Sequence, residues 1–177
     1  NLSCADGLGW DVVANQCSQL SSVKSRVNHA RHSQVYGTNL SGKGRLHTID
    51  GERNPDGHAS QRLDGGTGSE LRLDLGMPIV ADEIRIYSQA GHLPELTVLL
   101  KEGNGRLRTL GIFKSLRGGV TVIPVNNEKV DKIWFQTPHK GMDLAEVEVY
   151  GTGPCDYGWN IDTRFSSIVV TGQLKWT

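Results

Sequence analysis

The stretch that decides the fold is residues 142–151, which read MDLAEVEVYG. From Glu146 onward polar and apolar residues alternate with a period of two, and this pattern predicts a β-strand with one buried face. Glu146 stands at the start of that strand, directly after a loop, where a carboxylate is able to hold a hard cation. Residues 48–57, which read TIDGERNPDG, form a second segment rich in oxygen donors. We expect the two segments to meet in the fold and to frame one end of a β-sandwich.

Six further runs of apolar residues at strand spacing precede this stretch. They cover residues 71–75, 84–86, 96–100, 107–113, 120–125 and 130–135. The sequence Gly76-Met77-Pro78 is expected to end the first run, and Gly103-Asn104-Gly105 predicts a hairpin turn after the third. Residues 21–46 are polar and basic and predict an edge strand with long loops rather than a helix. Because no segment carries an amphipathic helix pattern, the predicted fold class is an all-β sandwich.

The composition bounds what the chain can be. Its 177 residues suffice for one domain with a substantial core, and 19 basic residues balance 19 acidic ones. This balance gives no electrostatic reason to expect nucleic acid or an acidic membrane as a partner. No apolar run approaches the ~20 residues that a membrane helix needs. The chain begins Asn-Leu-Ser-Cys, with no signal peptide and no initiating methionine, so we take it as a mature form or an excised piece of a longer protein.

The three cysteines, Cys4, Cys17 and Cys155, match no zinc-site spacing. We interpret them as disulfide-forming. A Cys4–Cys17 bond would close a local loop, and a Cys17–Cys155 bond would tie the two ends of a sandwich together. We prefer the local pair, although spacing does not determine connectivity; three buried reduced thiols are the alternative. Because disulfides persist in oxidising compartments, we expect a secreted or cell-surface protein, with the periplasm as the alternative location.

Four segments in this order resemble the discoidin family, which includes coagulation factor V/VIII C-type domains and many galactose-binding carbohydrate modules. They are residues 49–51 (IDG), 71–76 (LRLDLG), 81–87 (ADEIRIY) and 144–151 (LAEVEVYG). The resemblance covers residues 46–151 and implies a jelly-roll β-sandwich of the galactose-binding-domain-like type, a structural calcium ion and a ligand site in loops at one end. The chain departs from the family in lacking the usual Thr and Trp after the Ile-Asp-Gly turn, and in the extra length and two cysteines of its first sixty residues.

This resemblance also implies a domain organisation. Residues 1–45 are expected to be an extension that packs on the sandwich as part of the same domain. Residues 46–151 would form the core of the sandwich, and residues 152–177 a tail, an extra strand or a linker.

A calcium ion takes about six to eight oxygen ligands from carboxylates, carbonyls and water. The 48–57 turn supplies side-chain oxygens at several positions. Similarity to the family implies a ligand set made of the carbonyl of His47, the side chain of Asp50, position Glu52, the region of Pro55 or Asp56, the carbonyl of Ala145 and the side chain of Glu146. The ion would clamp the turn to the last strand in a structural role. The alternative is an ordinary solvated turn, because Asp, Asn, Pro and Gly are common in turns.

Sugar sites combine a few fixed polar groups with an apolar or aromatic face. The loops expected at the calcium end of the sandwich carry polar side chains suited to sugar hydroxyls. The candidate ligand-binding residues are His58, Arg62, His92, Arg117 and His139. Each of them alone is also typical of a solvated loop, and these loops carry no obvious aromatic residue. The basic content of residues 21–46 is compatible with an acidic polysaccharide as ligand or with a plain solvated surface.

The sequence carries neither a Gly-x-Ser-x-Gly elbow nor a His-Glu-x-x-His motif, and we assign no catalytic residue. The predicted function is a non-catalytic, extracellular carbohydrate-binding module with a structural calcium ion, which targets a larger protein to a glycan. Its expected partners are carbohydrate and other domains of a longer chain. A protein- or phospholipid-binding adhesion module of the same fold is the alternative, and a structural spacer is a third. The polar loops speak against the membrane version.

Overall fold

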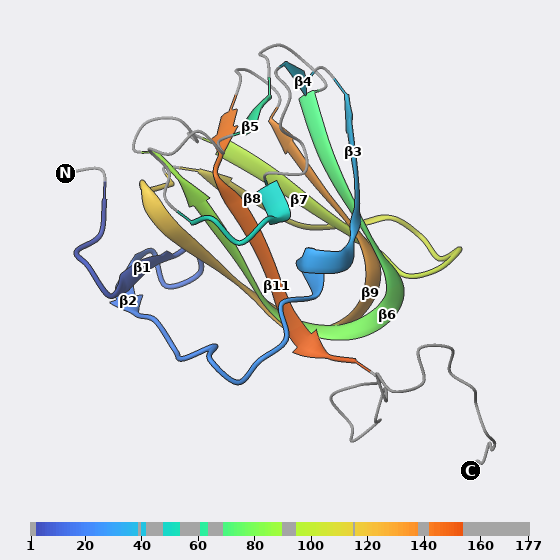
Figure 1. Cartoon of the computed structure of the whole chain (residues 1–177), viewed down its shortest axis with the longest axis horizontal. Helices are drawn as coiled ribbons and strands as arrows, with labels where there is room; N and C mark the ends of the chain where they lie inside the picture. Colours follow the sequence, from blue (N-terminus) through green and yellow to red (C-terminus); the bar gives the residue numbers. More distant parts are fainter. Residues whose placement is uncertain are drawn as a thin grey trace.

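The computed structural model describes residues 3–38, 40–41, 48–53, 61–63, 69–89, 95–114, 116–137 and 142–153. In this part of the chain the regular structure is β-strand, with one short 3-10 helix and a further 3-10 turn at residues 48–49 (Figure 1). The elements are β1 (Leu8–Asp11), β2 (Gln16–Gln19), η1 (His29–His32), β3 (Gln34–Thr38), β4 (Leu40–Ser41), β5 (Gln61–Leu63), β6 (Ser69–Ser88), β7 (Glu95–Lys101), β8 (Arg108–Lys114), β9 (Gly119–Thr137), β10 (Met142–Leu144) and β11 (Glu146–Thr152). The predicted all-β class is therefore confirmed. Among the described residues, no helix is long and apolar enough to cross a membrane.

Two long antiparallel strands, β6 and β9, form the frame of the sandwich. The first half of β6 lies between β3 and the second half of β9, which continues through β7 into β8. The second half of β6 lies between β11 and the first half of β9, which continues through β1 into β2. Both long strands curve over together (Figure 1), so one sheet supplies both layers. The short strands β4, β5 and β10 form a separate small sheet.

The curve in β6 falls at Gly76-Met77-Pro78, where the sequence predicts the end of a strand. The ladder to β9 is interrupted between Asp74 and Ile79. Pro78 has no N–H to donate to a ladder, and Gly76 adopts a φ of +82°. Pairing then resumes and continues to Ser88, so the prediction that the strand ends here is wrong. Gly76-Met77-Pro78 bends the strand instead of ending it. Similarly, the two predicted runs 120–125 and 130–135 belong to the single strand β9.

The core lies between the two layers and consists of alternate apolar residues on each strand. Fully buried members are Leu71, Leu73, Ile84, Ile86, Leu96, Val98, Leu100, Ile123, Ile133, Phe135, Val147 and Val149. Residues from both halves of β6 and β9 belong to one continuous cluster, which shows that the layers pack on each other. Burying a side chain of this size stabilises the fold by roughly 1.5–3 kcal/mol.

The start of the chain adds two strands to this sandwich. β1 pairs with β2 in a hairpin and runs parallel to β9, where Trp10 lies opposite Thr121. The Trp10 side chain is 5% exposed and joins the core. A disulfide links Cys4 to Cys17 and closes the hairpin, which confirms the local pairing preferred from sequence. Cys155 lies outside the described residues.

Residues 21–33 connect β2 to β3 and run across the β11 side of the sandwich (Figure 1). The predicted edge strand is β3, which pairs with β6. The region also contains the short 3-10 helix η1, which the sequence pattern does not indicate. The turn forms because the Asn28 side chain accepts a hydrogen bond from the Ala30 N–H at 3.1 Å and so caps it.

Candidate functional site

Strand β11 is buried on both of its faces, whereas the sequence predicts one buried face. Val147 and Val149 point into the core. The other face carries Glu146, Glu148 and Tyr150, which are 0%, 2% and 2% exposed. The prediction fails because segments far upstream in the chain cover this polar face, and alternation along a strand does not reveal such a cover. Two carboxylates are thereby removed from water. Burying a charged group is costly unless hydrogen bonds or an opposite charge stabilise it.

The turn around Asp50 meets the start of β11, as the sequence predicts. The Gly51 N–H donates a hydrogen bond to Glu146 Oε2 at 2.8 Å, across 95 residues of sequence. Within the turn, the Glu52 N–H donates to Asp50 Oδ1 at 2.9 Å. Thr48 and Ile49 are buried and fix the base of the turn. Gly51 has a φ of +96°, a conformation that residues with a Cβ rarely adopt.

The carboxylate of Glu146 is only half satisfied. Its Oε1 atom is buried and has no hydrogen-bond partner among the described residues. Burial, helped by the nearby charge of Asp50 and opposed by the Gly51 hydrogen bond, raises the pKa of Glu146 to about 8. Ionising such a group is costly unless a positive charge compensates it. An open carboxylate oxygen beside a second carboxylate is a donor set that fits a hard cation such as calcium.

The remaining predicted calcium ligands are only partly placed by the structure. Ala145 is fully buried next to Glu146, and its N–H donates to the Tyr87 carbonyl at 2.8 Å. Glu52 is exposed beside Asp50. His47, Pro55 and Asp56 lie outside the described residues. Within the described residues no group of three or more His, Cys, Asp or Glu side chains is arranged to hold a metal ion. Asp50 and Glu146 are therefore the part of the ligand set that the structure brings together.

Among the predicted sugar-binding residues, the structure gives a position to two. Arg62 lies on β5, where it pairs with Asp143 of β10 and with Ser41 of β4. The guanidinium group of Arg117 stacks on the Trp10 ring, 4.5 Å from its centroid, and so packs against the start of the chain. His58, His92 and His139 lie outside the described residues, and their convergence stays a prediction.

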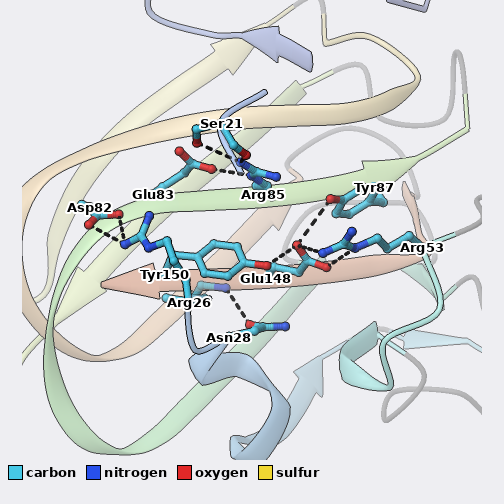
Figure 2. A network of polar contacts seen from close by, with 11 residues as sticks. Ser21, Arg26, Asn28, Arg53, Asp82, Glu83, Arg85, Tyr87, Glu148 and Tyr150 are labelled. Atoms are coloured by element: carbon cyan, nitrogen blue, oxygen red, sulfur yellow. Dashed lines mark hydrogen bonds and ion pairs between the residues drawn. The ribbon is translucent and has the colours of Figure 1, made fainter. Parts of the chain in front are cut away.

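The second buried carboxylate, Glu148, is fully hydrogen-bonded (Figure 2). Arg53 donates to it through Nε at 2.5 Å and Nη2 at 3.1 Å. The hydroxyl of Tyr150 donates to Oε1 at 2.7 Å, and that of Tyr87 approaches the same oxygen at 3.4 Å. Arg53 also stacks over the Tyr87 ring at 5.3 Å. Glu148 thus binds the turn that carries Asp50 to the last strand through a second connection besides Glu146.

Two further arginines join residues 21–28 to the strands beneath them (Figure 2). Arg26 forms an ion pair with Asp82, in which Nη2 donates to both carboxylate oxygens at 2.8 and 2.6 Å. Arg85, which is 3% exposed, pairs with Glu83 and donates to the Ser21 carbonyl at 2.8 Å. Both guanidinium groups lie over the Tyr150 ring, 5.3 and 5.6 Å from its centroid. These contacts hold the connecting segment against the polar face of β11.

Asn28 completes the attachment of this segment. Its Oδ1 atom accepts from the Val149 N–H at 3.0 Å, in addition to its role as the cap of η1. The prediction from sequence missed this whole network. A signal was present, because alternation places Glu146, Glu148 and Tyr150 on one face while residues 21–53 carry the complementary basic side chains. Nothing in the sequence indicates which arginine meets which carboxylate.

No protein-family model and no curated protein sequence matches the chain. Solved structures do resemble it. A fucose binding module from Streptococcus pneumoniae superposes with a TM-score of 0.65 at 19% identity, over 72% of this chain and 97% of that one. A fucolectin from striped bass (Morone saxatilis) serum gives a TM-score of 0.63 at 21% identity, over 70% of this chain and 48% of that one.

A module from Clostridium perfringens in complex with GalNAc-β-1,3-galactose gives a TM-score of 0.60 at 12% identity, over 71% of this chain and 100% of that one. At these identities the similarity establishes the fold. The chain shares its all-β jelly-roll sandwich with these structures, which is the fold that the resemblance implies.

Proposed function

We propose that this protein is a non-catalytic carbohydrate-binding module, stabilised by a structural calcium ion, that attaches a larger extracellular protein to a glycan. The observation that carries the proposal is the extent of the fold similarity, since the sandwich matches 97% of a module that binds fucose. Fold alone does not determine function, so the proposal also relies on the architecture of the site.

The calcium part of the proposal rests on Glu146 and Asp50. A cation held between these two carboxylates would compensate the buried charge of Glu146 and fix the turn to β11. His47, Glu52, Pro55, Asp56 and the carbonyl of Ala145 are the proposed further ligands. Bound calcium supplies no chemistry here beyond charge and rigidity. The Cys4–Cys17 disulfide supports an oxidising compartment, and hence an extracellular location.

The test is a glycan array probed with the labelled chain, in calcium and in chelator. We expect binding to a restricted set of glycans in calcium and weaker binding in chelator. Substituting His58, His92 or His139 by Ala should weaken that binding at least tenfold. His32→Ala is the matched control, because this exposed histidine belongs to η1 and not to the loops that carry the candidate residues. Absence of glycan binding, together with binding to phospholipid vesicles or to a protein, would refute the proposal and support the adhesion module instead.

A further inference from the structure

A cavity of about 600 Å³ lies between residues 21–31, the turn at 51–53 and the polar face of β11. Its volume is within the range of ligand pockets, roughly 300–1,000 Å³. The cavity wall contains five cationic side chains, Lys24, Arg26, Arg31, Arg53 and Arg85, and one carboxylate, Glu148. None of these residues belongs to the predicted calcium or sugar sites. The cavity is thus a second concave feature with its own chemistry.

Positive charge exceeds negative charge around this cavity. Arg26, Arg53 and Arg85 each have one carboxylate partner, which are Asp82, Glu148 and Glu83. Lys24 and Arg31 form no ion pair within the described part of the chain, and both are exposed. Arg31 lies against Gly51, where its charge acts on Glu146. Lys24 has no such neighbouring acid among the described contacts. The cavity wall therefore carries more cationic than anionic side chains, which favours an anionic ligand.

The three paired arginines also keep unused donors. A guanidinium group has five N–H donors in a rigid, planar arrangement. Arg26 contacts Asp82 through Nη2 alone, and neither Arg53 nor Arg85 uses Nη1 in the hydrogen bonds described. Their carboxylate partners and the stacked tyrosine rings already hold these groups in place. A ligand that binds them loses little side-chain entropy, because the donors are ordered in advance.

The cavity does not suit a neutral sugar ring. Such a ring requires an open aromatic or apolar face, and the aromatic residue of the wall, Tyr150, is 2% exposed beneath the guanidinium groups of Arg26 and Arg85. What remains is a surface of N–H donors and positive charge. Planar or tetrahedral oxyanions are the groups that arginine binds best, through charge-assisted and often bidentate hydrogen bonds.

We infer that this cavity binds the carboxylate or sulfate group of an acidic saccharide, at a subsite separate from the loops of the proposed sugar site. The inference rests on the proposed function, since it makes the ligand a charged glycan. Lys24 and Arg31 attract and contact the oxyanion, and the fixed arginines supply hydrogen bonds. Residues 21–31 then serve as one wall of a binding cavity as well as a cover for β11.

Isothermal titration calorimetry with the whole chain tests this inference. The probes are a sulfated heparin tetrasaccharide, a tetragalacturonate, a neutral tetrasaccharide and sodium sulfate. The double variant Lys24→Gln/Arg31→Gln removes the unpaired cations of the cavity. The control Arg106→Gln/Lys114→Gln removes the same charge at exposed positions in the β7–β8 hairpin, remote from the cavity wall. Circular dichroism tests whether each variant is folded. If the double variant is not folded, the single variant Lys24→Gln takes its place.

We expect at least one acidic tetrasaccharide to bind the unmodified chain at least tenfold more tightly than the neutral one. Lys24→Gln/Arg31→Gln should weaken that binding at least tenfold, and the control at most twofold. In NMR titrations the side-chain Nε–H signals of Arg26, Arg53 and Arg85 should shift with the acidic probe only. Equal losses in variant and control, or no preference for an acidic probe, would overturn the inference.

Sodium sulfate distinguishes a saccharide from a free anion. Binding of free sulfate as tightly as the tetrasaccharide would overturn the saccharide part of the inference. The glycan array tests the proposed function separately, because neutral glycans that bind at the loops should be unaffected by Lys24→Gln/Arg31→Gln. Array binding without a charge preference would leave the proposed function standing and refute this subsite alone.

Discussion

Two glutamates of the same strand face show opposite solutions to the burial of a carboxylate. Glu148 accepts hydrogen bonds from an arginine and from tyrosine hydroxyls. Glu146 accepts one backbone hydrogen bond and keeps an oxygen atom open. A fully bonded carboxylate holds neighbouring segments together, whereas a half-bonded one is available to an additional cation. Although the two residues lie only two positions apart on the same strand face, this difference in hydrogen bonding gives them different roles.

The hydroxyl groups around Glu148 allow a matched comparison. Tyr150→Phe removes a hydrogen bond of 2.7 Å to a buried carboxylate, and hydrogen bonds to charged groups contribute about 1.5–3 kcal/mol. Tyr87→Phe removes a contact of 3.4 Å and keeps the ring on which Arg53 stacks. Guanidinium chloride unfolding should show the larger loss of stability for Tyr150→Phe, and less than about 1 kcal/mol for Tyr87→Phe. Equal losses would mean that Glu148 does not depend on the Tyr150 hydroxyl.

At the level of elements, the contact between β11 and β6 depends on close backbone approach at its end. The register shifts between Tyr150 and Gly151, where the ladder to β6 contains an irregularity. A Cβ atom on Gly151 would lie 2.3 Å from the Val80 carbonyl oxygen and 2.7 Å from Ala81 Cα. Both atoms belong to backbone that the ladder holds in place. Glycine is required at this position because the strands approach too closely for any side chain.

Gly151→Ala should therefore destabilise the fold by about 2–3 kcal/mol, the upper part of the range for overpacked sites. Gly111→Ala in β8 is the control. Its Cβ atom would lie 2.6 Å from the tip of the Phe113 ring, a partly buried side chain that can shift more easily than backbone. Alanine in a strand also gains roughly 0.5–1 kcal/mol over glycine, so Gly111→Ala should be nearly neutral. Chemical denaturation measures both variants, and a loss for Gly111→Ala as large as that for Gly151→Ala would contradict the backbone explanation.

For the whole molecule, the turn at 48–53 is joined to the last strand by two carboxylates instead of by an apolar contact alone. Ligand binding to the folded state alone raises its stability by mass action. A calcium ion at Asp50 and Glu146 would thus stabilise the entire sandwich, because the last strand lies along β6, which takes part in both layers.

We expect calcium at a hundredfold excess over its dissociation constant to add about 2.7 kcal/mol of stability. For a chain of this length the melting temperature should rise by roughly 5–10 °C relative to chelator. Glu146→Gln should abolish the difference. Glu102→Gln should preserve it, because Glu102 lies at the β7–β8 hairpin and the one ion pair of its carboxylate within the described residues is a long contact of 3.6 Å with Lys129. Differential scanning calorimetry measures this, and equal melting of the unmodified chain in calcium and in chelator would refute the calcium site.

Alternation in the sequence was sufficient to predict the fold class, and the oxygen donors of residues 48–57, together with the family resemblance, predicted that the Asp50 turn meets Glu146. It misjudged Gly76-Met77-Pro78, because a turn signal and a strand bend use the same residues. It also missed the arginine network, since the contacts of Arg26 with Asp82, of Arg53 with Glu148 and of Arg85 with Ser21 join segments far apart in the sequence. The Cys4–Cys17 bond was predictable as a local loop, whereas the parallel pairing of β1 with β9 carries no local signal.

The parallel strand β1 and the connecting segment determine how the chain can be cut. A fragment limited to residues 46–151, the span of the family resemblance, would leave β6 without β3 and β9 without β1. It would also remove Trp10 from the core and take away Ser21 and Arg26, which cover Arg85 and Tyr150. A fragment that begins at the recognisable motifs would therefore have open sheet edges that favour aggregation, and a recombinant version of this protein should keep the chain from Cys4 through the end of β11 at Thr152.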